Sequence, residues 1–593
     1  MVCNLPGGGR LGKGATLLPM SGGVGAQYTP AVGWAQAIAF RRDEQGSSEW
    51  RGAMAVATGG DASASTNGFW AALNIATTLD LPMLFYMEDN GYGISVPAPL
   101  QTPGGDHVAN LASWPSLKIV DGDGADPRVT PGLVREAVNH CREGKGAALL
   151  RLKVPRLCGH TFQDTQAYKP AELIEAENKR DPLPRLRTYL LEENILTEDT
   201  WAELEAEAEQ AVREALAEAE ARPQPNPQQL KRHVFAEKRL DGSPELSTIG
   251  GLAAGGHAFP ESSDEPQPSG QRINMITAIR RTLDAELKSN PKLLVFGEDV
   301  GPKGGVHGAT LGLADAHGDA RVFDTSLSEE GIIGRSVGMA VAGLMPVPEI
   351  QFRKYAEPAA EQLTDAGTMR WRTANRFACP MVVRVPGGFA RRGDPWHSMC
   401  DEVEWAHKVG WQVAMPSQAE DAVGLLRAAL RGDNPTIFFE HRHLYDNAWS
   451  RRPYPGDDYL LPFGRAHQVV EGNRLTIVTW GAMVERCEAV AQLRAGAVEV
   501  LDLRTLVPWD RERTLESVKK TGRCLIVHED NRTAGFGSEV AAVLADELFW
   551  ELDAPLRRVT MPDIPNPHNL GLLETAVPSQ DKIAAAVTAL LAI

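Results

Sequence analysis

Two short polar motifs, separated by the length of one helix and one strand, constrain the fold of this chain most strongly. The first is GGDAS, which follows the apolar run MAVAT, and the second is EDNGYG, which follows LPMLFYM. Asp61 of the first motif and Asn90 of the second are 29 residues apart, and the intervening residues predict a helix over 67–80 and a strand over 82–88. That is one βαβ crossover, so we expect both motifs at the carboxyl ends of neighbouring parallel strands.

Polar groups at this edge of a parallel sheet favour a site for a metal and phosphates, because open α/β sheets bind ligands outside the carboxyl ends of their strands. The Asp61 carboxylate, the Asn90 amide oxygen and the backbone carbonyl of Tyr92 are hard oxygen ligands of the kind that Mg²⁺ prefers. The N-terminus of the helix over 67–80 would offer N–H groups to phosphates. Either motif alone is an ordinary turn, and their spacing is what favours a diphosphate and its metal.

The rest of the chain divides into blocks that alternate strand-like and helix-like segments. Residues 1–240 predict a first parallel sheet, followed by an acidic helix over about 198–221. Residues 241–271 are rich in Gly, Ser and Pro and predict a flexible linker. A second α/β block covers 272–450 and a third covers 465–593. The predicted fold class is α/β, with two doubly wound parallel-sheet domains and a further α/β domain.

Composition and charge narrow the functional classes. Hydrophobic residues make up 43% of the 593 residues, which is enough for large buried cores. The net charge of −17 argues against a broad nucleic-acid-binding surface. The seven cysteines show no zinc-ligand spacing and favour a reducing, cytoplasmic location. We find no run of 18 apolar residues and expect neither a membrane span nor a secretory signal.

The paired motifs resemble the signature of thiamine-diphosphate enzymes. The stretch GGDASASTNGFWAALNIATTLDLPMLFYMEDNGYGIS resembles the α subunit of the E1 components of 2-oxo acid dehydrogenases. The resemblance implies that thiamine diphosphate and Mg²⁺ bind here, with the metal held by Asp61, Asn90 and the Tyr92 carbonyl. Ala62 replaces the family's second glycine, which places a methyl group near the diphosphate.

Two further segments extend this resemblance to the α subunit. SGGVGAQYTPAVG at 21–33 resembles the segment that passes beside the cofactor, although alone it is typical of a Gly-rich turn before a helix. LCGHTFQDTQAYK at 157–169 resembles the E1α loop around a catalytic histidine, which implies that His160 is catalytic. A lone histidine in a polar loop is otherwise usually solvated. The further cofactor contacts that the resemblance implies in this half are Gly22, Val24, Gly60, Ala62 and Ser63.

The second α/β block resembles the E1 β subunit over VFDTSLSEEGIIGRSVGMAVAGLMPVPEIQF at 322–352. Thiamine diphosphate chemistry needs a carboxylate beside the aminopyrimidine ring, and the family pattern puts it at Glu329, not at Glu330. Without that context SLSEEG is typical of a helix cap with acidic residues in the first turn. The other contacts to the pyrimidine that the resemblance implies are Leu327, Gln351 and Tyr355.

DPWHSMCDEVEW at 394–405 resembles the β-subunit segment that holds a second active-site histidine, which implies that His397 is a proton donor. Nothing marks the nearby Cys400 as a nucleophile. Residues 465–593 resemble the transketolase C-terminal domain, which in this family builds the dimer and partner surface. We therefore expect a homodimer equivalent to an α₂β₂ assembly.

The order α subunit, linker, β subunit predicts a fused E1 that decarboxylates a 2-oxo acid and passes the acyl group to a lipoylated E2 acyltransferase. EIQFRKY, FFEHRHLY and HEDNRTAGFGSEV are more similar to the branched-chain type, so the predicted substrate is 3-methyl-2-oxobutanoate. A pyruvate or acetoin dehydrogenase and a transketolase-like transferase stay open as alternatives. Only 20 residues precede Ser21, where E1α has a longer segment, which suggests a truncation and, as a third hypothesis, an inactive subunit with an assembly role.

Overall fold

The chain forms two compact units, which are described separately below. The computed structural model describes residues 9–10, 14–19, 21–254, 259–390 and 393–593. The N-terminal unit is Met20–Arg232, and the C-terminal unit contains His233–Ile593 together with Met1–Pro19. The division after residue 232 lies close to the boundary at 240 that the sequence predicts.

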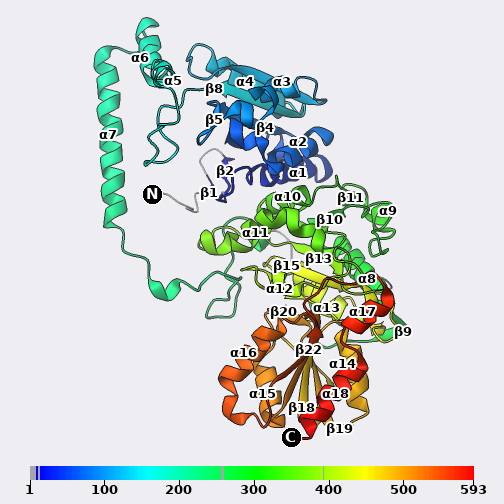
Figure 1. Cartoon of the computed structure of the whole chain (residues 1–593). Helices are drawn as coiled ribbons and strands as arrows, with labels where there is room; N and C mark the ends of the chain where they lie inside the picture. The colour runs from blue at the N-terminus through cyan, green and yellow to red at the C-terminus, as the bar shows by residue number, and fades with distance from the viewer. Residues whose placement is uncertain (1–8, 11–13, 20, 255–258, 391–392) are drawn as a thin grey trace. The chain divides into compact units, whose positions relative to one another are not determined.

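The N-terminal unit is built on a four-stranded parallel sheet with the strand order β3-β4-β8-β7, of which β4 and β8 are labelled in Figure 1. Its strands are β3 (Ala55–Gly60), β4 (Met83–Asp89), β7 (Leu117–Asp123) and β8 (Ala147–Lys153). Its main helices are α1 (Tyr28–Ala39), α2 (Asn67–Thr78) and α4 (Thr130–Arg142). One apolar cluster packs α1 and α2 on one face of the sheet, and a second packs α4 on the other. The predicted β3–α2–β4 crossover is therefore confirmed, with Ala55 paired to Met83.

An acidic helix, α7 (Glu198–Ala221), follows this sheet domain at the predicted position. The Thr197 side chain accepts the N–H of Thr200 and the Thr200 hydroxyl accepts the N–H of Thr197, so the helix begins with a reciprocal cap. The shorter elements of this unit are β5 (Tyr92–Gly93), β6 (Val96–Pro97), α3 (His107–Leu111), α5 (Ala171–Asn178) and α6 (Pro182–Glu192). Strands β1 (Gly9–Arg10) and β2 (Thr16–Leu17), which pair with each other, belong to the C-terminal unit. In the part of the chain that the structure describes, no helix has the length and apolar character needed to cross a membrane.

The C-terminal unit contains a seven-stranded sheet with the order β11-β10-β12-β13-β15-β14-β20. Its strands are β10 (Leu293–Gly297), β11 (Val322–Asp324), β12 (Met345–Glu349), β13 (Val382–Gly387), β14 (Gln412–Ala414), β15 (Thr436–His441) and β20 (Thr505–Val507). Its helices are α8 (Met275–Ser289), α9 (Leu313–His317), α10 (Glu329–Val341), α11 (Ala360–Arg372), α12 (Glu402–Ala406) and α13 (Ala419–Leu430). Helices α8 and α13 pack together on one face, and α10 and α11 lie on the other (Figure 1).

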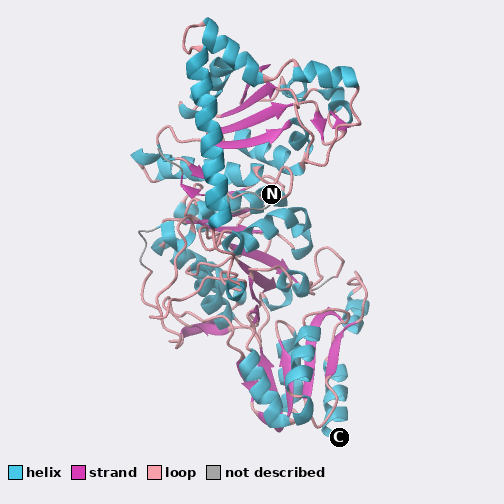
Figure 2. Ribbon diagram, turned by 90° about the vertical axis from the view of Figure 1, so that its left-hand side faces the viewer, coloured by secondary structure: helices cyan, strands magenta, loops and turns pink. Residues whose placement is uncertain are grey.

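A second sheet of this unit has the order β17-β19-β18-β21-β22, with helices on both faces (Figure 2). Its strands are β17 (His467–Val470), β18 (Gly472–Thr479), β19 (Gly496–Asp502), β21 (Cys524–Asn531) and β22 (Arg557–Met561). Its helices are α14 (Met483–Gln492), α15 (Arg511–Thr521), α16 (Gly537–Glu547), α17 (Leu570–Ala576) and α18 (Gln580–Leu591). The predicted third α/β block is thus present, but β20, which follows β19 in the chain, leaves it and pairs antiparallel with β14 of the other sheet.

The described residues of 241–271 differ from the predicted flexible linker, because they are hydrogen-bonded along the surface of the C-terminal unit. Ile249 donates its N–H to Arg376 and accepts the N–H of Ala378. Ser263 pairs with Tyr459, and β9 (Ser269–Ile273) pairs antiparallel with β16 (Arg452–Tyr454). Composition predicted flexibility here because large apolar side chains are scarce, but the bonds come from main-chain groups, which every residue carries.

Candidate active site

The two polar motifs meet at the carboxyl ends of β3 and β4, as the crossover predicts. The Asp61 side chain is buried, with 2% of its surface exposed, and its Oδ1 accepts the backbone N–H of Asn90 at 3.3 Å. The Asn90 Oδ1 in turn accepts the backbone N–H of Tyr92 at 3.1 Å. Three predicted metal ligands are therefore linked by direct hydrogen bonds.

The environment of the Asp61 carboxylate is typical of a cation ligand. Its Oδ2 is buried and has no hydrogen-bond partner among the residues that the structure describes. Burial, and then repulsion from Asp89, raise the pKa of the Asp61 carboxyl. A buried carboxylate with an unsatisfied oxygen and an acidic neighbour is unfavourable by itself and becomes favourable beside a divalent cation, so the donor set fits Mg²⁺.

The turn between β3 and α2 differs in one respect from the prediction. A 3₁₀ turn, η4 (Asp61–Ser65), precedes the helix, and the Thr66 side chain caps α2 by accepting the N–H of Phe69. The Ser63 hydroxyl donates to the Gly60 carbonyl at 2.6 Å and meets the Tyr28 hydroxyl. The Thr66 cap therefore occupies the Phe69 N–H, one of the N–H groups at the start of α2 that the sequence predicted to face phosphates.

The methyl group of Ala62 has a specific place in the site. It faces Gly93, where an added Cβ would lie 2.6 Å from the Ala62 Cβ. Gly93 therefore provides the space that the replacement of the family's glycine requires.

The glycine-rich segment at 21–33 lies against the same turn. Gly25 has a φ of +90°, and a Cβ there would collide with the Thr66 side chain. Gln27 donates from Nε2 to the Thr58 carbonyl of β3 at 3.0 Å. Gly22 and Val24 both lie exposed in this loop, and the Val24 side chain is 70% exposed. The loop thus presents an apolar side chain to solvent at the carboxyl edge of the sheet.

The loop that carries His160 is fastened to the EDNGYG turn. The Asp164 carboxylate accepts the N–H of His160 at 2.7 Å and the hydroxyl of Tyr168 at 2.9 Å. Arg156 binds both Asp164 and the Ile94 carbonyl, two residues beyond Tyr92. The His160 side chain is exposed, so this hydrogen-bonded loop presents the imidazole to solvent.

In the C-terminal unit, Glu329 is the first residue of α10, and Ser328 caps the helix by accepting the N–H of Gly331 at 3.2 Å. Its neighbour Glu330 is buried and accepts a hydrogen bond from Gln362. Leu327 is 84% exposed just before the cap. The two adjacent glutamates thus have different environments, and Glu329 is the one at the helix end.

Glu298, which the sequence motifs did not single out, is a neighbour of Glu329. It follows β10, and its Oε1 is buried without a hydrogen-bond partner in the described ranges. Burial, and then the charges of Glu329 and Asp299, raise its pKa to about 7. Gln351 donates from Nε2 to the Glu298 carbonyl at 3.3 Å and to Asp299 at 3.1 Å. The sequence could have indicated Glu298, because this acidic residue directly follows the apolar strand β10, at the edge of the sheet where ligands bind.

Tyr355 and His397 meet at the same edge of the seven-stranded sheet. The Tyr355 hydroxyl lies 2.7 Å from His397 Nε2. Asp394, Glu329 and Glu298 all add to the effect of burial in raising the pKa of Tyr355, which places these carboxylates around it. The structure therefore brings together Glu329, Gln351, Tyr355 and His397, which were predicted from the segments SLSEEG, EIQFRKY and DPWHSMC.

Comparison of the sequence with known proteins indicates the family to which a chain with these residue clusters belongs. The 2-oxoisovalerate dehydrogenase subunit beta of Pseudomonas aeruginosa is 42% identical over 50% of this chain and 89% of its own length. That of Bacillus subtilis is 38% identical over 53% of this chain and 97% of its own length. The family described as Dehydrogenase E1 component matches residues 6–228.

The chain belongs to the thiamine-diphosphate-dependent 2-oxo acid dehydrogenase E1 family. The transketolase pyrimidine binding domain matches residues 271–447 of this E1 chain, and the transketolase C-terminal domain matches 464–583. Parts of α and β type are thus joined in one chain. Among solved structures, one described as a split gene transketolase, inactive β4 tetramer, covers 54% of this chain and 99% of its own, with 21% identity and a TM-score of 0.43.

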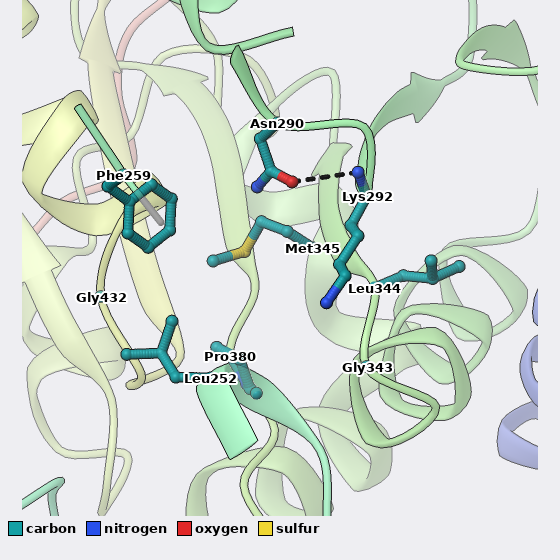
Figure 3. Close-up of a pocket in the computed structure, with 10 residues that line it drawn as sticks. Leu252, Phe259, Asn290, Lys292, Gly343, Leu344, Met345, Pro380 and Gly432 are labelled. Atoms are coloured by element: carbon teal, nitrogen blue, oxygen red, sulfur yellow. Dashed lines mark hydrogen bonds between the residues drawn. The ribbon is translucent and has the colours of Figure 1, made fainter. Parts of the chain in front are cut away.

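A separate small cavity of the E1 chain lies at the other end of the seven-stranded sheet. It measures about 40 Å³, and Figure 3 shows Leu252 and Phe259 of the surface segment facing Met345 and Pro380 across it. Asn290 and Lys292 also line the cavity, and the backbone N–H of Lys292 donates to the Asn290 side-chain oxygen at 3.0 Å. These residues stand at the amino ends of the strands, whereas Glu298 and Gln351 follow the carboxyl ends, so the cavity is distinct from the candidate active site.

Proposed function

We propose that this E1 chain decarboxylates 3-methyl-2-oxobutanoate and transfers the resulting 2-methylpropanoyl group to a lipoyl group on an E2 acyltransferase. The observation that carries the catalytic part is the buried, unpartnered Oδ2 of Asp61 beside Asn90 and Tyr92. The proposed substrate is supported by the relatives, which are named as dehydrogenases of 2-oxoisovalerate, another name for 3-methyl-2-oxobutanoate. These relatives align with the β half of the chain.

The residues of the N-terminal unit would hold thiamine diphosphate through Mg²⁺. Asp61 and Asn90 would supply side-chain oxygens and Tyr92 its carbonyl, while the N–H groups of η4 would donate to phosphate oxygens. When bound, thiamine diphosphate supplies the electron sink that receives the electron pair left by departing CO₂. Gly22 and Val24, in the loop held by Gln27, would pack against the cofactor.

The residues of the C-terminal unit would handle protons. Glu329 would bind the aminopyrimidine ring through its carboxylate, with Leu327, Gln351 and Tyr355 around the ring. Burial and the charges of Glu329 and Asp299 raise the pKa of Glu298 to about 7, so part of the Glu298 population carries a proton near pH 7, which limits the negative charge beside Glu329. His397 and His160 present imidazoles that would give protons to the acyl group or to the lipoyl sulfur.

The test is a side-by-side measurement of CO₂ release from 3-methyl-2-oxobutanoate and pyruvate, with thiamine diphosphate, Mg²⁺ and an artificial electron acceptor. We expect a higher kcat/KM for the branched substrate. A preference for pyruvate would overturn the substrate and keep the E1 chemistry, whereas activity only on sugar phosphates would favour a transferase. A lipoylated E2 domain added in place of the acceptor should become acylated.

Two neighbouring glutamates provide a matched pair of variants for the same assay. Glu329→Gln is expected to abolish turnover, because an amide cannot take the place of the carboxylate. Glu330→Gln is expected to keep most of the turnover, because Glu330 is buried against Gln362 within the protein. The reverse result would show that the activating carboxylate has been misassigned.

A further inference from the structure

His397 is held by a carboxylate from its own loop. Asp394 Oδ1 accepts the backbone N–H groups of Trp396 and His397, each at 2.8 Å. Both carboxylate oxygens of Asp394 also lie 2.9 Å from His397 Nδ1. Burial alone would raise the pKa of the Asp394 carboxyl, but the hydrogen bonds from His397 and Trp396 outweigh it and keep that pKa below its usual value. The group facing Nδ1 is therefore an ionised carboxylate.

This contact determines which imidazole nitrogen carries the proton. An ionised carboxylate only accepts hydrogen bonds, so Nδ1 must be the protonated nitrogen. In the neutral ring Nε2 then has a free lone pair, and the Tyr355 hydroxyl at 2.7 Å can donate to it. When Nε2 gains a proton, it donates a hydrogen bond to the same Tyr355 oxygen. Nε2 is thus the nitrogen at which protons are exchanged.

The ring and the backbone of His397 are fixed by further contacts. The Phe352 ring meets the imidazole edge-to-face, with 4.5 Å between the centroids. Arg442 donates to the His397 carbonyl at 2.8 Å. Within the described residues, which leave out 391–392, the titratable and charged groups in hydrogen-bond contact with His397 are Asp394, Tyr355 and Arg442. The side chain keeps 37% of its surface exposed, so the ring is oriented without being enclosed.

We propose that Asp394 is a positioning residue for His397: its carboxylate holds the proton on Nδ1 and thereby directs Nε2, backed by the Tyr355 hydroxyl, to the reacting acyl group. This inference rests on the proposed function, in which His397 exchanges a proton with the substrate. In the transfer, the Tyr355 hydroxyl gives up its hydrogen bond to Nε2 so that Nε2–H can face the acceptor atom, the Nε2–H bond breaks, and a new bond to hydrogen forms on that atom. The Nδ1–H···Asp394 hydrogen bond persists throughout, so no second proton moves.

The first test reads the tautomer of His397 directly, without any turnover. In full-length protein with ¹⁵N-labelled histidine, the His397 ring signals are assigned by their loss in His397→Gln. We expect Nδ1–H in the wild type and a loss of that preference in Asp394→Asn, whose amide NH₂ can donate to Nδ1. The proposal would be overturned if the wild-type His397 ring carried its proton on Nε2, or if the tautomer were the same in Asp394→Asn as in the wild type.

The second test uses kinetics. In Asp394→Asn we expect kcat to fall about 10- to 100-fold and KM to change less than about threefold. The expected fall in kcat is a part of the roughly 10²- to 10⁴-fold rate increase that a general acid or base contributes. The limb of the pH profile that reports His397 should move to lower pH, because the anionic neighbour is gone. Glu404→Gln, an exposed carboxyl near the same loop that pairs with Lys354, is the control and should leave both unchanged.

The two tests separate this proposal from the proposed function. A chain that turns over no 2-oxo acid would defeat the function, and the tautomer result would still decide the role of Asp394. An active chain in which Asp394→Asn has the wild-type pH profile and kcat would overturn the positioning role alone. A loss of activity without any shift in tautomer or pH profile would mean that Asp394 only stabilises the loop.

Discussion

Glu298 shows how the environment of one carboxyl can affect both stability and chemistry. Its buried Oε1 lacks a partner within the described part of the chain, and Glu329 and Asp299 lie close enough to disfavour its charge. Because burial and these neighbours raise its pKa to about 7, the folded state holds the proton more tightly than the unfolded state does. The folded state therefore loses stability as the pH rises from about 4.5 to about 7, and the loss is complete above that window.

We predict that Glu298→Gln raises the melting temperature of the cofactor-free protein at pH 8, because glutamine imitates the protonated carboxyl. The gain should be smaller at pH 5, where the wild-type Glu298 already carries its proton in the folded state. Differential scanning calorimetry at both pH values measures this. Glu220→Gln, which changes an exposed carboxyl on α7, should shift neither midpoint, and an equal gain at both pH values would contradict the assignment.

At the scale of elements, a buried polar cluster joins the two sheets of the C-terminal unit. His441 ends β15 of one sheet, and its Nε2 contacts the carboxylate of Glu529 in β21 of the other. His441 Nδ1 accepts the N–H of His443, so the Nε2 nitrogen carries the proton and donates it to Glu529. Burial lowers the pKa of His441, which keeps the ring neutral. Because both ring nitrogens of His441 are engaged in hydrogen bonds within the protein, we interpret the buried group of Cys400, His441 and Glu529 as a structural contact and not as a metal site.

We predict that His441→Ala lowers the free energy of unfolding by about 3 kcal/mol, because it leaves a buried carboxylate without its donor. Chemical denaturation of the full chain gives this value. His407→Ala removes an exposed histidine of the same sheet domain and should cost less than about 0.5 kcal/mol. Equal effects of the two substitutions would show that the contact does not stabilise the junction.

Local patterns account for the elements that the sequence predicted correctly. Apolar periodicity predicts the crossover β3–α2–β4, and a threonine cap marks the start of helix α7. Both signals are carried by residues close together in the sequence. The prediction that Asp61 and Asn90 meet also came from local spacing, and the structure confirms it. The assigned roles of these residues stay predictions.

Pairings between distant segments were not predictable in this way. Strand β20 has three residues, and its partner β14 lies about ninety positions earlier in the chain. The surface segment around Ile249 is held by main-chain bonds to Arg376, which composition does not reveal. The Tyr355 hydroxyl reaches Nε2 of His397 from a segment about forty positions earlier in the chain. Such contacts depend on the tertiary fold, not on any periodicity.

At the scale of the whole molecule, we expect two copies of the 64.2 kDa chain to associate. The C-terminal unit exposes large apolar side chains, among them Phe549 at 62% and Trp550 at 91%, which a partner surface would cover. Light scattering coupled to gel filtration should give a mass of twice the chain mass at micromolar concentration. A monomer under those conditions would contradict the predicted α₂β₂-equivalent dimer.

We expect Asp61 to hold thiamine diphosphate through Mg²⁺, and Glu329 to be needed for turnover and not for binding of the cofactor. The most direct measurement is the calorimetric affinity for thiamine diphosphate with Mg²⁺ in the wild type, Asp61→Asn and Glu329→Gln. We predict a loss of about 100-fold, or ~2.7 kcal/mol, in Asp61→Asn and a change below about threefold in Glu329→Gln. Wild-type affinity in Asp61→Asn would contradict the account, because the unpartnered carboxylate oxygen would then have no part in holding the cofactor.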